Sequence, residues 1–555
     1  MRRQRRLLVT ARHQDLTLPP DLSRDRAVGP VRVRRPIYLD LLPPCNEACP
    51  AGENIQAWLA KVVEGDDKGA WEILVQDNPM PAVHGRVCYH PCESSCNRGK
   101  LESPVSIHAV ERYLGDKAIA EGWQIPVPAF KTGKRVLVVG AGPAGLSCAY
   151  HLARLGHAVE IREAGPLAGG MMHFGIPAYR LPRQILSAEI GRIEAMGVKI
   201  ILNHKVEDLA AEKGQGNFDA VFLAIGAGVG KKTEIPAREA GKILDAVSFL
   251  KGVELGEAPK LGRKVAIYGG GNTAMDAARV AKRLGVEPLI IYRRDREHMP
   301  AHEFEADEAI EEGVKIHWLR TIKSMEAGQI QVEVMKLDEK GKPQPTGEIE
   351  ILDADDLILA LGQDTDTSFL RTVEGIEFQD DGVVIVSSQM MTGHPGIFAG
   401  GDMAPSERTV TIAVGHGKKA ARNIDGYLHG QALKPLAKKD VAHLEKLRLW
   451  FFADAAARIQ SQIPVADRMA TFGEVMQGLA PDDAQFEARR CFSCGNCFEC
   501  DGCYGACPED AIIKLGPGKR YEVDFNLCTG CGTCFDQCPV HAISLVPEPE
   551  GVFTK

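Results

Sequence analysis

The order of apolar and polar residues along this chain predicts two strand–turn–helix units. The apolar runs KRVLVVG (134–140) and KVAIYGG (264–270) have the length and composition of buried parallel strands. Each run enters a glycine-rich turn, and then apolar residues recur every three or four positions, as in an amphipathic helix. Further apolar strands are expected at AIGAG from Ala224, at ILALGQ from Ile358 and at GIFAGGDMA (396–404), before a helix over 409–424. This order predicts two α/β domains, one of which is split by the other.

Helical periodicity also marks both flanks of these units. NIQAWLAKVVEG (54–65), WEILVQD (71–77) and SIHAVERYLGDKAIAEG (106–122) predict a small helical domain near the amino terminus. The segments 444–460 and 468–479 are expected to be helices joined by polar turns, and they carry no recognisable chemistry. The cluster Trp450-Phe451-Phe452 within them is interpreted as a packing anchor, with a docking face as the alternative.

Length, charge and composition argue against a nucleic-acid-binding protein and against a membrane protein. The 555 residues exceed what one core organises, so several domains are expected, and the net charge of −8 gives no reason to expect nucleic acid. No run approaches the roughly eighteen apolar residues of a membrane helix, and no apolar signal core follows the first arginines. Residues 1–35 hold ten arginines and three acids, which favours a flexible tail over an arm that docks on an acidic partner. The protein is expected to be cytoplasmic.

Sixteen cysteines in a chain without an export signal are expected to be metal ligands. Two copies of the spacing C-x2-C-x2-C-x3-C-P lie near the carboxyl terminus. Three thiolates of such a loop hold one 4Fe-4S cube, and the fourth, before the proline, reaches the neighbouring cube. Structural zinc and a disulfide framework are the alternatives, but neither explains the repeated Cys-Pro. The predicted ligand sets are Cys497, Cys500, Cys503 and Cys538 for one cluster, and Cys507, Cys528, Cys531 and Cys534 for the other.

The first glycine-rich turn, with Gly140, Gly142 and Gly145, has the spacing of a dinucleotide-binding loop. Its glycines let backbone N–H groups approach a pyrophosphate at the start of a helix. Glu163 ends the next strand, eighteen residues after Gly145, where a carboxylate accepts hydrogen bonds from ribose hydroxyls. A carboxylate there indicates a nucleotide without a 2′-phosphate, which we interpret as FAD.

The second turn, with Gly269, Gly271 and Ala274, precedes a strand that ends in Arg293 and Arg294 rather than in an acid. Guanidinium groups at that place suit an adenosine 2′-phosphate, so the second nucleotide is interpreted as NADPH. The alternative is that both arginines are ordinary surface charges.

Five motifs together resemble a known family. GAGPAGLSCAYHLARLGHAVEIREA, GGMMHFGIPAYRLP, GGGNTAMDAARVAKRLG, YRRDREHMPA and GIFAGGDM resemble the small subunit of NADPH-dependent glutamate synthase and the matching domains of dihydropyrimidine dehydrogenase, over roughly 41–430. The resemblance implies a two-dinucleotide-binding flavoprotein fold. It implies FAD contacts at Gly140, Ala141, Gly142, Ala144, Gly145, Glu163, Gly170, Met171 and Asp402. It implies NADPH contacts at Gly271, Asn272, Thr273, Arg293 and Arg294. For GGMMHFGIP a purely structural loop is the alternative.

The resemblance also implies which of the remaining cysteines bind clusters. The related proteins carry a C-x2-C pair upstream of the position of Cys45, but residues 1–44 contain no cysteine here. Cys491 and Cys494 lie instead in FEARRCFSCG. This segment looks like the Arg-Cys-x2-Cys-Gly sequence that those relatives carry in their amino-terminal cluster domain. One amino-terminal cluster would therefore be held by Cys45, Cys96, Cys491 and Cys494. The other would be held by Cys49, Cys88, Cys92 and a non-cysteine ligand, either Glu111, which aligns with a glutamine of dihydropyrimidine dehydrogenase, or His84. Cys148 is expected to be a core residue.

These features predict a multidomain chain with a helical Fe-S domain, then α/β Rossmann-like FAD and NADPH domains, then a small α+β ferredoxin-like domain. The expected boundaries are 1–40 for a basic flexible tail, 41–130 for the helical Fe-S domain, 131–262 and 358–430 for the two parts of the FAD domain, 263–357 for the NADPH domain, 431–485 for a helical linker and 486–555 for the ferredoxin-like domain.

The expected function follows from the cofactors. NADPH gives two electrons as hydride and a cluster accepts one, so FAD would convert between them, with four 4Fe-4S clusters passing electrons on. The expected partner is ferredoxin or a redox enzyme such as a 2-oxoacid:ferredoxin oxidoreductase, within a hetero-oligomer. The alternatives are a glutamate synthase small subunit, which the appended ferredoxin-like segment disfavours, and a non-catalytic electron-transfer subunit.

Overall fold

The computed structural model describes residues 32–231, 233–238, 241–431 and 439–549. The chain forms two compact units. The central unit consists of Pro43–Lys438 and Asp454–Phe492, and the terminal unit consists of Met1–Leu42, Lys439–Ala453 and Ser493–Lys555. Among the described residues, no helix combines the length and the apolar character needed to cross a membrane.

The central unit begins with a helical domain. Its helices are α2 (Pro44–Ala48), α3 (Ile55–Val63), α4 (Asp67–Leu74), α5 (Pro81–Val87), α6 (Pro91–Ser94), the 3-10 helix η1 (Asn97–Lys100) and α7 (Ile107–Ala120). Trp58 and Trp71 are fully buried in its core. A Cβ on Gly115 would lie 2.3 Å from the Ala82 backbone nitrogen, so this glycine lets α7 approach α5 closely. The helices expected over 54–65, 71–77 and 106–122 are present as α3, α4 and α7.

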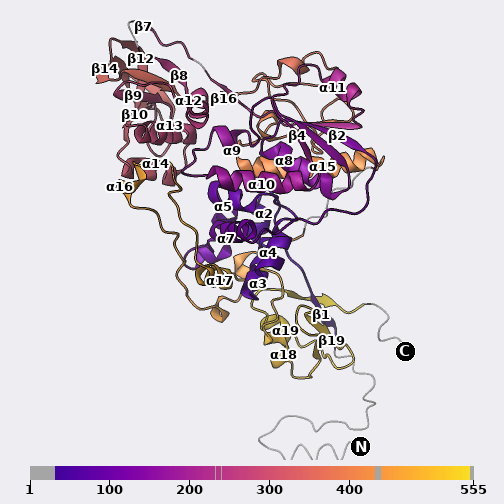
Figure 1. The fold of residues 1–555 in the computed structure, drawn as a ribbon. Helices are drawn as coiled ribbons and strands as arrows, with labels where there is room; N and C mark the ends of the chain where they lie inside the picture. Colours follow the sequence, from indigo (N-terminus) through magenta and orange to yellow (C-terminus); the bar gives the residue numbers. More distant parts are fainter. Residues whose placement is uncertain (1–31, 232, 239–240, 432–438, 550–555) are drawn as a thin grey trace, which may run out of the picture. The chain divides into compact units, whose positions relative to one another are not determined.

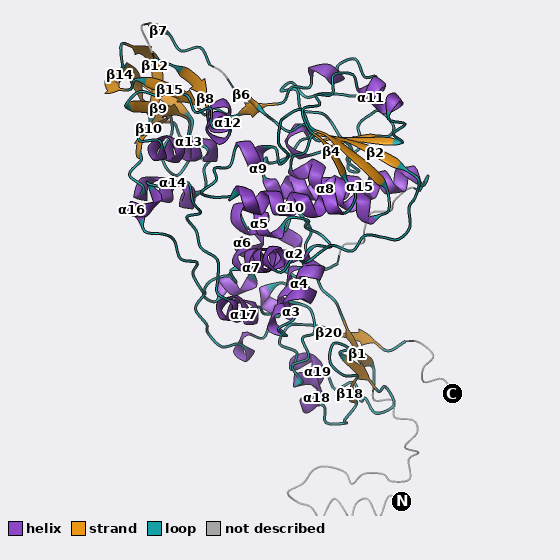
Figure 2. Ribbon diagram, viewed as in Figure 1, coloured by secondary structure: helices purple, strands orange, loops and turns teal. Residues whose placement is uncertain are grey.

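The first nucleotide-binding domain is built on a five-stranded parallel sheet of order β17-β5-β2-β3-β4. Its strands are β2 (Arg135–Val139), β3 (Ala158–Arg162), β4 (Lys199–Ile201), β5 (Ala220–Leu223) and β17 (Ile397–Ala399). The helices α8 (Pro143–Arg154), α10 (Arg183–Ala195) and α15 (Val410–Leu428) lie together on one side of this sheet (Figure 2). In Figure 1 the orange α15 runs beside the magenta α8, although more than 250 residues separate them. The carboxyl-terminal part of this domain therefore packs directly behind its first glycine turn.

The second nucleotide-binding domain has a parallel sheet of order β11-β10-β9-β15-β8. Its strands are β8 (Ile243–Asp245), β9 (Lys264–Tyr268), β10 (Glu287–Tyr292), β11 (Lys315–Trp318) and β15 (Asp356–Leu359). Its helices are α12 (Ala246–Glu254), α13 (Asn272–Arg283) and α14 (Glu303–Glu311). A second sheet of order β14-β13-β12-β7 is formed by β7 (Ala237–Arg238), β12 (Arg320–Glu326), β13 (Gln329–Leu337) and β14 (Pro343–Asp353).

The predicted limits of this domain, 263 and 357, are wrong at both ends. The strand of ILALGQ is β15, which lies between β9 and β8 in the parallel sheet of the second nucleotide-binding domain. The chain leaves the first domain at β6 (Val229–Gly230) and returns at β16 (Gln363–Asp364), and these two strands pair antiparallel. An apolar run identifies a buried strand, but it does not say which of two similar sheets the strand joins.

The helices predicted over 444–460 and 468–479 are also wrong. The structure has the 3-10 helices η4 (Leu444–Lys446) and η5 (Leu449–Phe451) and the short helix α16 (Val465–Arg468), with extended chain between them. In the central unit, the Val475 N–H donates to the Tyr179 carbonyl at 3.0 Å, and the Ala455 N–H donates to Glu102 at 2.9 Å. These bonds to other elements replace the intrahelical bonds that the apolar periodicity predicted. The segment ends in α17 (Pro481–Arg489).

The terminal unit is a small α+β domain. It contains α18 (Gly502–Ala506), α19 (Thr533–Asp536) and the strands β1 (Arg34–Tyr38), β18 (Ile512–Lys514), β19 (Tyr521–Val523) and β20 (Ile543–Pro547). β18 pairs with β19, and β1 pairs with β20, both antiparallel. The expected tail over 1–40 is therefore too long, because residues 34–38 form a strand, whereas residues 1–31 lie outside the described part. Its partner strand is about 500 residues away, so no local signal marks it.

Candidate functional site

The first glycine turn is shaped by close backbone contacts. A Cβ on Gly140 would lie 2.4 Å from the Ala224 carbonyl oxygen, and one on Gly145 would lie 2.0 Å from the Gly140 carbonyl oxygen. At Gly142, the N-cap of α8, nothing lies within 4 Å of the corresponding position. The turn therefore leaves an open cradle at a helix amino terminus, which fits the pyrophosphate of a dinucleotide.

Glu163 lies directly beside this turn. It follows β3, and its carboxylate accepts the Ala141 N–H at 2.8 Å and the Gly165 N–H at 2.7 Å. The carboxylate therefore lies at the carboxyl end of the sheet, close to the cradle. This placement fits the ribose contact expected of it.

Two more predicted segments reach the same turn. A Cβ on Gly170 would lie 2.9 Å from Gly142 Cα, so the start of α9 (Met171–Phe174) packs against the cradle. Asp402 lies in the 3-10 helix η3 (Gly401–Met403), and burial raises its pKa. A Cβ on the preceding Gly401 would lie 3.0 Å from Ala144 Cβ, so η3 packs against α8. Segments from four parts of the chain therefore converge on one site that fits FAD.

The second glycine turn repeats this arrangement. A Cβ on Gly269 would lie 2.2 Å from the Ala360 carbonyl oxygen, while the space at Gly271 is open. Asn272 and Thr273 follow as the first residues of α13. The second cradle thus also lies at a helix amino terminus, and its shape fits a pyrophosphate.

Arg293 and Arg294 follow β10, which is the direct neighbour of β9. Arg293 is exposed and Arg294 is half-buried, and the Arg294 Nε has no hydrogen-bond partner. Among the described residues, neither arginine pairs with a carboxylate, whereas the nearby Arg296 pairs with Asp307 and Glu303. Two unpaired guanidinium groups beside the second cradle fit a 2′-phosphate.

Tyr89 connects a cysteine loop to this second turn. The Asn272 side chain donates to the Tyr89 hydroxyl at 2.6 Å and accepts the His302 N–H at 3.0 Å. The rings of Tyr89 and His302 stack at 3.7 Å between centroids. Sequence reasoning missed this contact. The only signal was an aromatic residue next to Cys88.

Cys49, Cys88 and Cys92 form one buried group of thiols. Burial raises the pKa of Cys88 to about 12, and the Glu111 carboxylate adds to this increase. Burial also raises the pKa of Cys92, with further contributions from Glu93, Cys49 and Cys88. Bare thiolates would therefore be unstable here, while iron supplies the positive charge that stabilises them. The donor set fits an iron–sulfur cluster.

Both candidate non-cysteine ligands, Glu111 and His84, lie in one buried group of polar side chains. The Asn78 side-chain nitrogen is 2.7 Å from a Glu111 oxygen, 3.0 Å from a Glu53 oxygen and 2.8 Å from His84 Nδ1. His84 Nε2 is buried and has no hydrogen-bond partner, and burial lowers the pKa of this ring to about 3. Glu53 is a third buried group that the sequence did not single out, and burial raises its pKa to about 7.

A second group of cysteines brings distant segments together within the central unit. Cys45, Cys96 and Cys491 belong to one hydrophobic cluster with Ala488 of α17, and this cluster also includes Cys49 and Cys92. Arg490 ties α17 to the helical domain by donating to the carbonyls of Ser103 at 2.7 Å and Pro104 at 2.8 Å. Cys494 belongs to the terminal unit and is buried. Cys148 is fully buried in α8.

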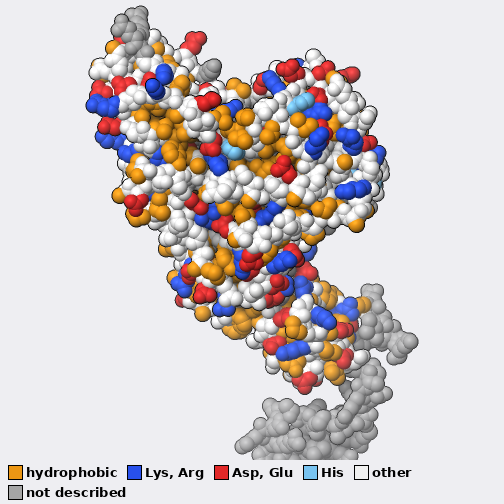
Figure 3. Space-filling model, viewed as in Figure 1, with side chains coloured by type: hydrophobic (Ala, Val, Ile, Leu, Met, Phe, Trp, Pro, Cys, Tyr) orange, Lys and Arg blue, Asp and Glu red, His pale blue; other side chains and the backbone are white. Residues whose placement is uncertain are grey.

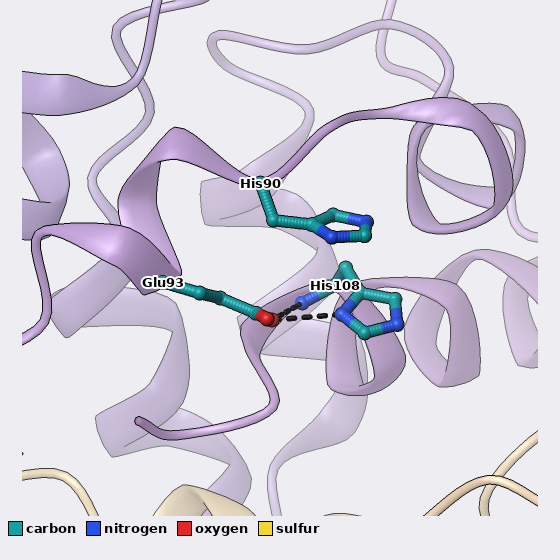
Figure 4. Close-up of side chains that lie close together, drawn as sticks. All are labelled: His90, Glu93 and His108. Atoms are coloured by element: carbon teal, nitrogen blue, oxygen red, sulfur yellow. Dashed lines mark hydrogen bonds and ion pairs between the residues drawn. The ribbon is translucent and has the colours of Figure 1, made fainter. Parts of the chain in front are cut away.

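His90, Glu93 and His108 form a third titratable cluster (Figure 4). His108 Nδ1 is 2.7 Å from Glu93 Oε1, and His108 Nε2 is 2.8 Å from the side-chain oxygen of Gln460. The two imidazole rings stack at 3.8 Å with 22° between their planes. Their lone pairs therefore lie in nearly parallel planes and do not meet at one point, so this trio has the geometry of a hydrogen-bonded stack rather than of a metal site.

In the terminal unit, the cysteines line two small cavities. One cavity is lined by Cys497, Cys500, Cys503 and Cys538, together with Tyr38 and Tyr521. The other is lined by Cys507, Cys528, Cys531 and Cys534, together with Pro36. Four thiols around each cavity are the donor set of a 4Fe-4S cluster.

The sequence was compared with known protein families. Residues 134–417 match the family described as pyridine nucleotide-disulphide oxidoreductase. Residues 41–123 match dihydropyrimidine dehydrogenase domain II, 4Fe-4S cluster, and residues 521–544 match a 4Fe-4S binding domain. These matches confirm the predicted order of a helical Fe-S domain, nucleotide-binding folds and a ferredoxin-like domain.

Several relatives are similar to this chain over most of its length. It is 37% identical to the NADP(+)-dependent formate dehydrogenase subunit beta of Moorella thermoacetica, over 81% of this chain and 70% of that one. It is 33% identical to the NADPH-Fe(3+) oxidoreductase subunit beta of Geobacter sulfurreducens, over 81% and 75%. It is 32% identical to the glutamate synthase [NADPH] small chain of Escherichia coli, over 70% and 89%. The resemblance predicted from the five motifs is therefore confirmed.

Proposed function

Because the chain belongs to the pyridine nucleotide-disulphide oxidoreductase family, we propose that it transfers electrons between NADPH and a partner redox protein, with FAD and iron–sulfur clusters as its cofactors. When bound, FAD supplies the conversion between the two-electron chemistry of hydride and the one-electron chemistry of the clusters. The protein's own residues hold and orient the cofactors, and no side-chain acid, base or nucleophile is required. The enzyme is thus an NADPH-dependent flavoprotein oxidoreductase.

One observation carries this proposal. The loop from Cys88 to Cys92 contacts both nucleotide-binding domains. Cys88 Sγ accepts a hydrogen bond from Thr411 at 3.0 Å, and Thr411 is in the first turn of α15, behind the first glycine turn. Tyr89, the next residue, bonds to Asn272 at the second turn. A cluster on this loop would be in contact with both nucleotide-binding domains, as an electron acceptor for their chemistry should be.

The proposed nucleotide contacts keep the roles that the motifs imply. FAD is held by Gly140, Ala141, Gly142, Ala144, Gly145, Glu163, Gly170, Met171 and Asp402. NADPH is held by Gly271, Asn272, Thr273, Arg293 and Arg294. The convergence of the first set and the two unpaired arginines of the second set support this assignment.

The proposed metal ligands form four sets of four. In the terminal unit they are the two groups of cysteines that line the two cavities. In the central unit, Cys49, Cys88 and Cys92 are joined by Glu111, whose charge acts on both Cys49 and Cys88. The fourth set is Cys45, Cys96, Cys491 and Cys494, and its last member rests on the C-x2-C spacing.

The partner is proposed from the relatives. Those from Moorella and Geobacter are named as beta subunits of larger oxidoreductases. We infer that this chain is likewise the NADPH-oxidising subunit of a hetero-oligomer. Its direct electron acceptor would be ferredoxin or a catalytic subunit, for example of a 2-oxoacid:ferredoxin oxidoreductase.

An anaerobic titration of the purified protein with NADPH tests this function. Stoichiometric NADPH should bleach the flavin absorbance, and electron paramagnetic resonance (EPR) spectra should then show reduced clusters. NADH at the same concentration serves as the control and should bleach more slowly. A flavin that stays oxidised with NADPH would contradict the proposal.

A further inference from the structure

The amino-terminal strand β1 is part of the terminal unit that carries the carboxy-terminal cysteines. Figure 2 shows β1 beside β20, and the register pairs Tyr38 with Ile543 and Pro36 with Leu545. Backbone bonds extend the pairing, because the Leu39 N–H donates to the Ala542 carbonyl at 2.9 Å. The strand is therefore held in a fixed register against the end of the chain.

This strand borders both cysteine-lined cavities. Pro36 and Tyr38 are two residues apart, so their side chains lie on the same face of β1. Pro36 lines the cavity of Cys507, Cys528, Cys531 and Cys534. Tyr38 lines the cavity of Cys497, Cys500, Cys503 and Cys538. The two cavities receive different side chains from the strand, since proline offers no hydrogen-bond donor and tyrosine offers one.

The Tyr38 hydroxyl lies 3.2 Å from Cys503 Sγ. A cysteine that binds iron has lost its proton, so the tyrosine O–H must then be the donor. A phenol carries its proton at neutral pH, so the Tyr38 hydroxyl can act as that donor. The ring is held by stacking on Tyr521 at 6.3 Å, and the Tyr521 hydroxyl in turn donates to Asp501 at 2.6 Å.

We propose that Tyr38 raises the reduction potential of the cluster held by Cys497, Cys500, Cys503 and Cys538, by donating a hydrogen bond to the Cys503 sulfur. Reduction of a cluster adds one electron, and the negative charge on its sulfur ligands increases. A hydrogen-bond donor stabilises that charge, so it favours the reduced form. The proposal rests on the proposed function, because it assumes that electrons pass through the terminal clusters. Tyr38 is a positioning residue for this electron transfer.

The test is a mediated redox titration of the full-length chain, followed by EPR. Tyr38→Phe keeps the ring but removes the donor, so the midpoint potential of one cluster should move to a lower value while the others stay unchanged. Tyr113→Phe is the matched control, because it removes the same kind of hydroxyl from the central unit, where that hydroxyl bonds to Asp67. That control should reproduce the wild-type midpoints.

Two results would overturn the proposal. The first is a Tyr38→Phe midpoint equal to that of the wild type and of Tyr113→Phe. The second is loss of iron from Tyr38→Phe, which would give the side chain a purely structural role. Because mediators deliver the electrons, the titration does not depend on NADPH. A failed nicotinamide reaction and an absent Tyr38 effect are therefore distinguished.

Discussion

The terminal and central units gather their cysteines in opposite ways. In the terminal unit, eight cysteines between Cys497 and Cys538 line two cavities, and both loops are local in sequence. In the central unit, one hydrophobic cluster joins Cys45 and Cys96 to Cys491, almost 400 residues away. The terminal arrangement can be read from spacing alone, whereas the central one exists only because α17 folds back onto the helical domain.

The surroundings of the thiols differ as well. In the central unit, Glu53, His84 and Glu111 form one buried group whose two carboxyl groups act on Cys88, and the loop of Cys88 contacts both nucleotide domains. In the terminal unit, Cys531 is exposed. We therefore expect the central unit to take up electrons and the terminal unit to release them. Figure 3 shows basic and acidic side chains of the described residues interspersed on the visible face, rather than gathered in one basic stripe.

The largest effect is expected from breaking a terminal cluster. Cys500→Ser removes one of four thiols around its cavity, so reduction of a bacterial two-cluster ferredoxin by NADPH should fall to background. Bleaching of the flavin by NADPH should keep its wild-type rate, because both nucleotide sites lie in the central unit. Stopped-flow absorbance measures both reactions. Ferredoxin reduction at the wild-type rate would place the exit elsewhere.

The next largest effect is expected from replacing Arg293 and Arg294, and it should be limited to the reaction with NADPH. Changing Arg293 and Arg294 to alanine removes charge-assisted bonds worth about 1.5–3 kcal/mol each, so KM for NADPH should rise by roughly tenfold or more. KM for NADH should hardly change. Arg296→Ala is the control, since this nearby arginine is already paired with acids. Equal effects on both cofactors would show that the pair does not bind a 2′-phosphate.

Cys491→Ser tests whether the central unit holds a cluster with Cys491 as a ligand. It should lower the iron content by about four atoms per chain, because a 4Fe-4S cube would lose a ligand. Cys148→Ala is the matched control, as this buried cysteine lies in α8 and is not a proposed ligand. Iron analysis after anaerobic purification compares the two variants. An unchanged iron content in Cys491→Ser would exclude this cysteine as a ligand.

The smallest effect is expected at Tyr89. Tyr89→Phe removes the bond to Asn272, and a neutral hydrogen bond contributes about 0.5–1.5 kcal/mol, so KM for NADPH should rise roughly two- to tenfold. Tyr113→Phe serves as the control, because its hydroxyl bonds to Asp67 on the helical domain. If both variants behave alike in steady-state kinetics, the Tyr89 contact does not support the second nucleotide site.

Sequence reasoning worked where the chemistry depends on neighbours in the chain. The spacing around Cys497 and Cys528 and the glycine turns at Gly140 and Gly269 are local patterns, and each lies on the expected kind of element. It failed where a distant partner decides the structure. β1 pairs with a strand about 500 residues away, and the backbone of Val475 bonds to Tyr179 rather than within a helix. Tyr89 and Asn78 were missed for the same reason, because their partners lie on other elements.

Iron content most directly tests the central claim that both units hold clusters. The four proposed ligand sets predict about sixteen iron atoms per chain and per FAD in the anaerobically purified protein, since each cube contributes four. A value near twelve would leave one of the four proposed sets without a cluster and contradict the predicted total. A value near eight would leave only two of the four proposed clusters and contradict the account.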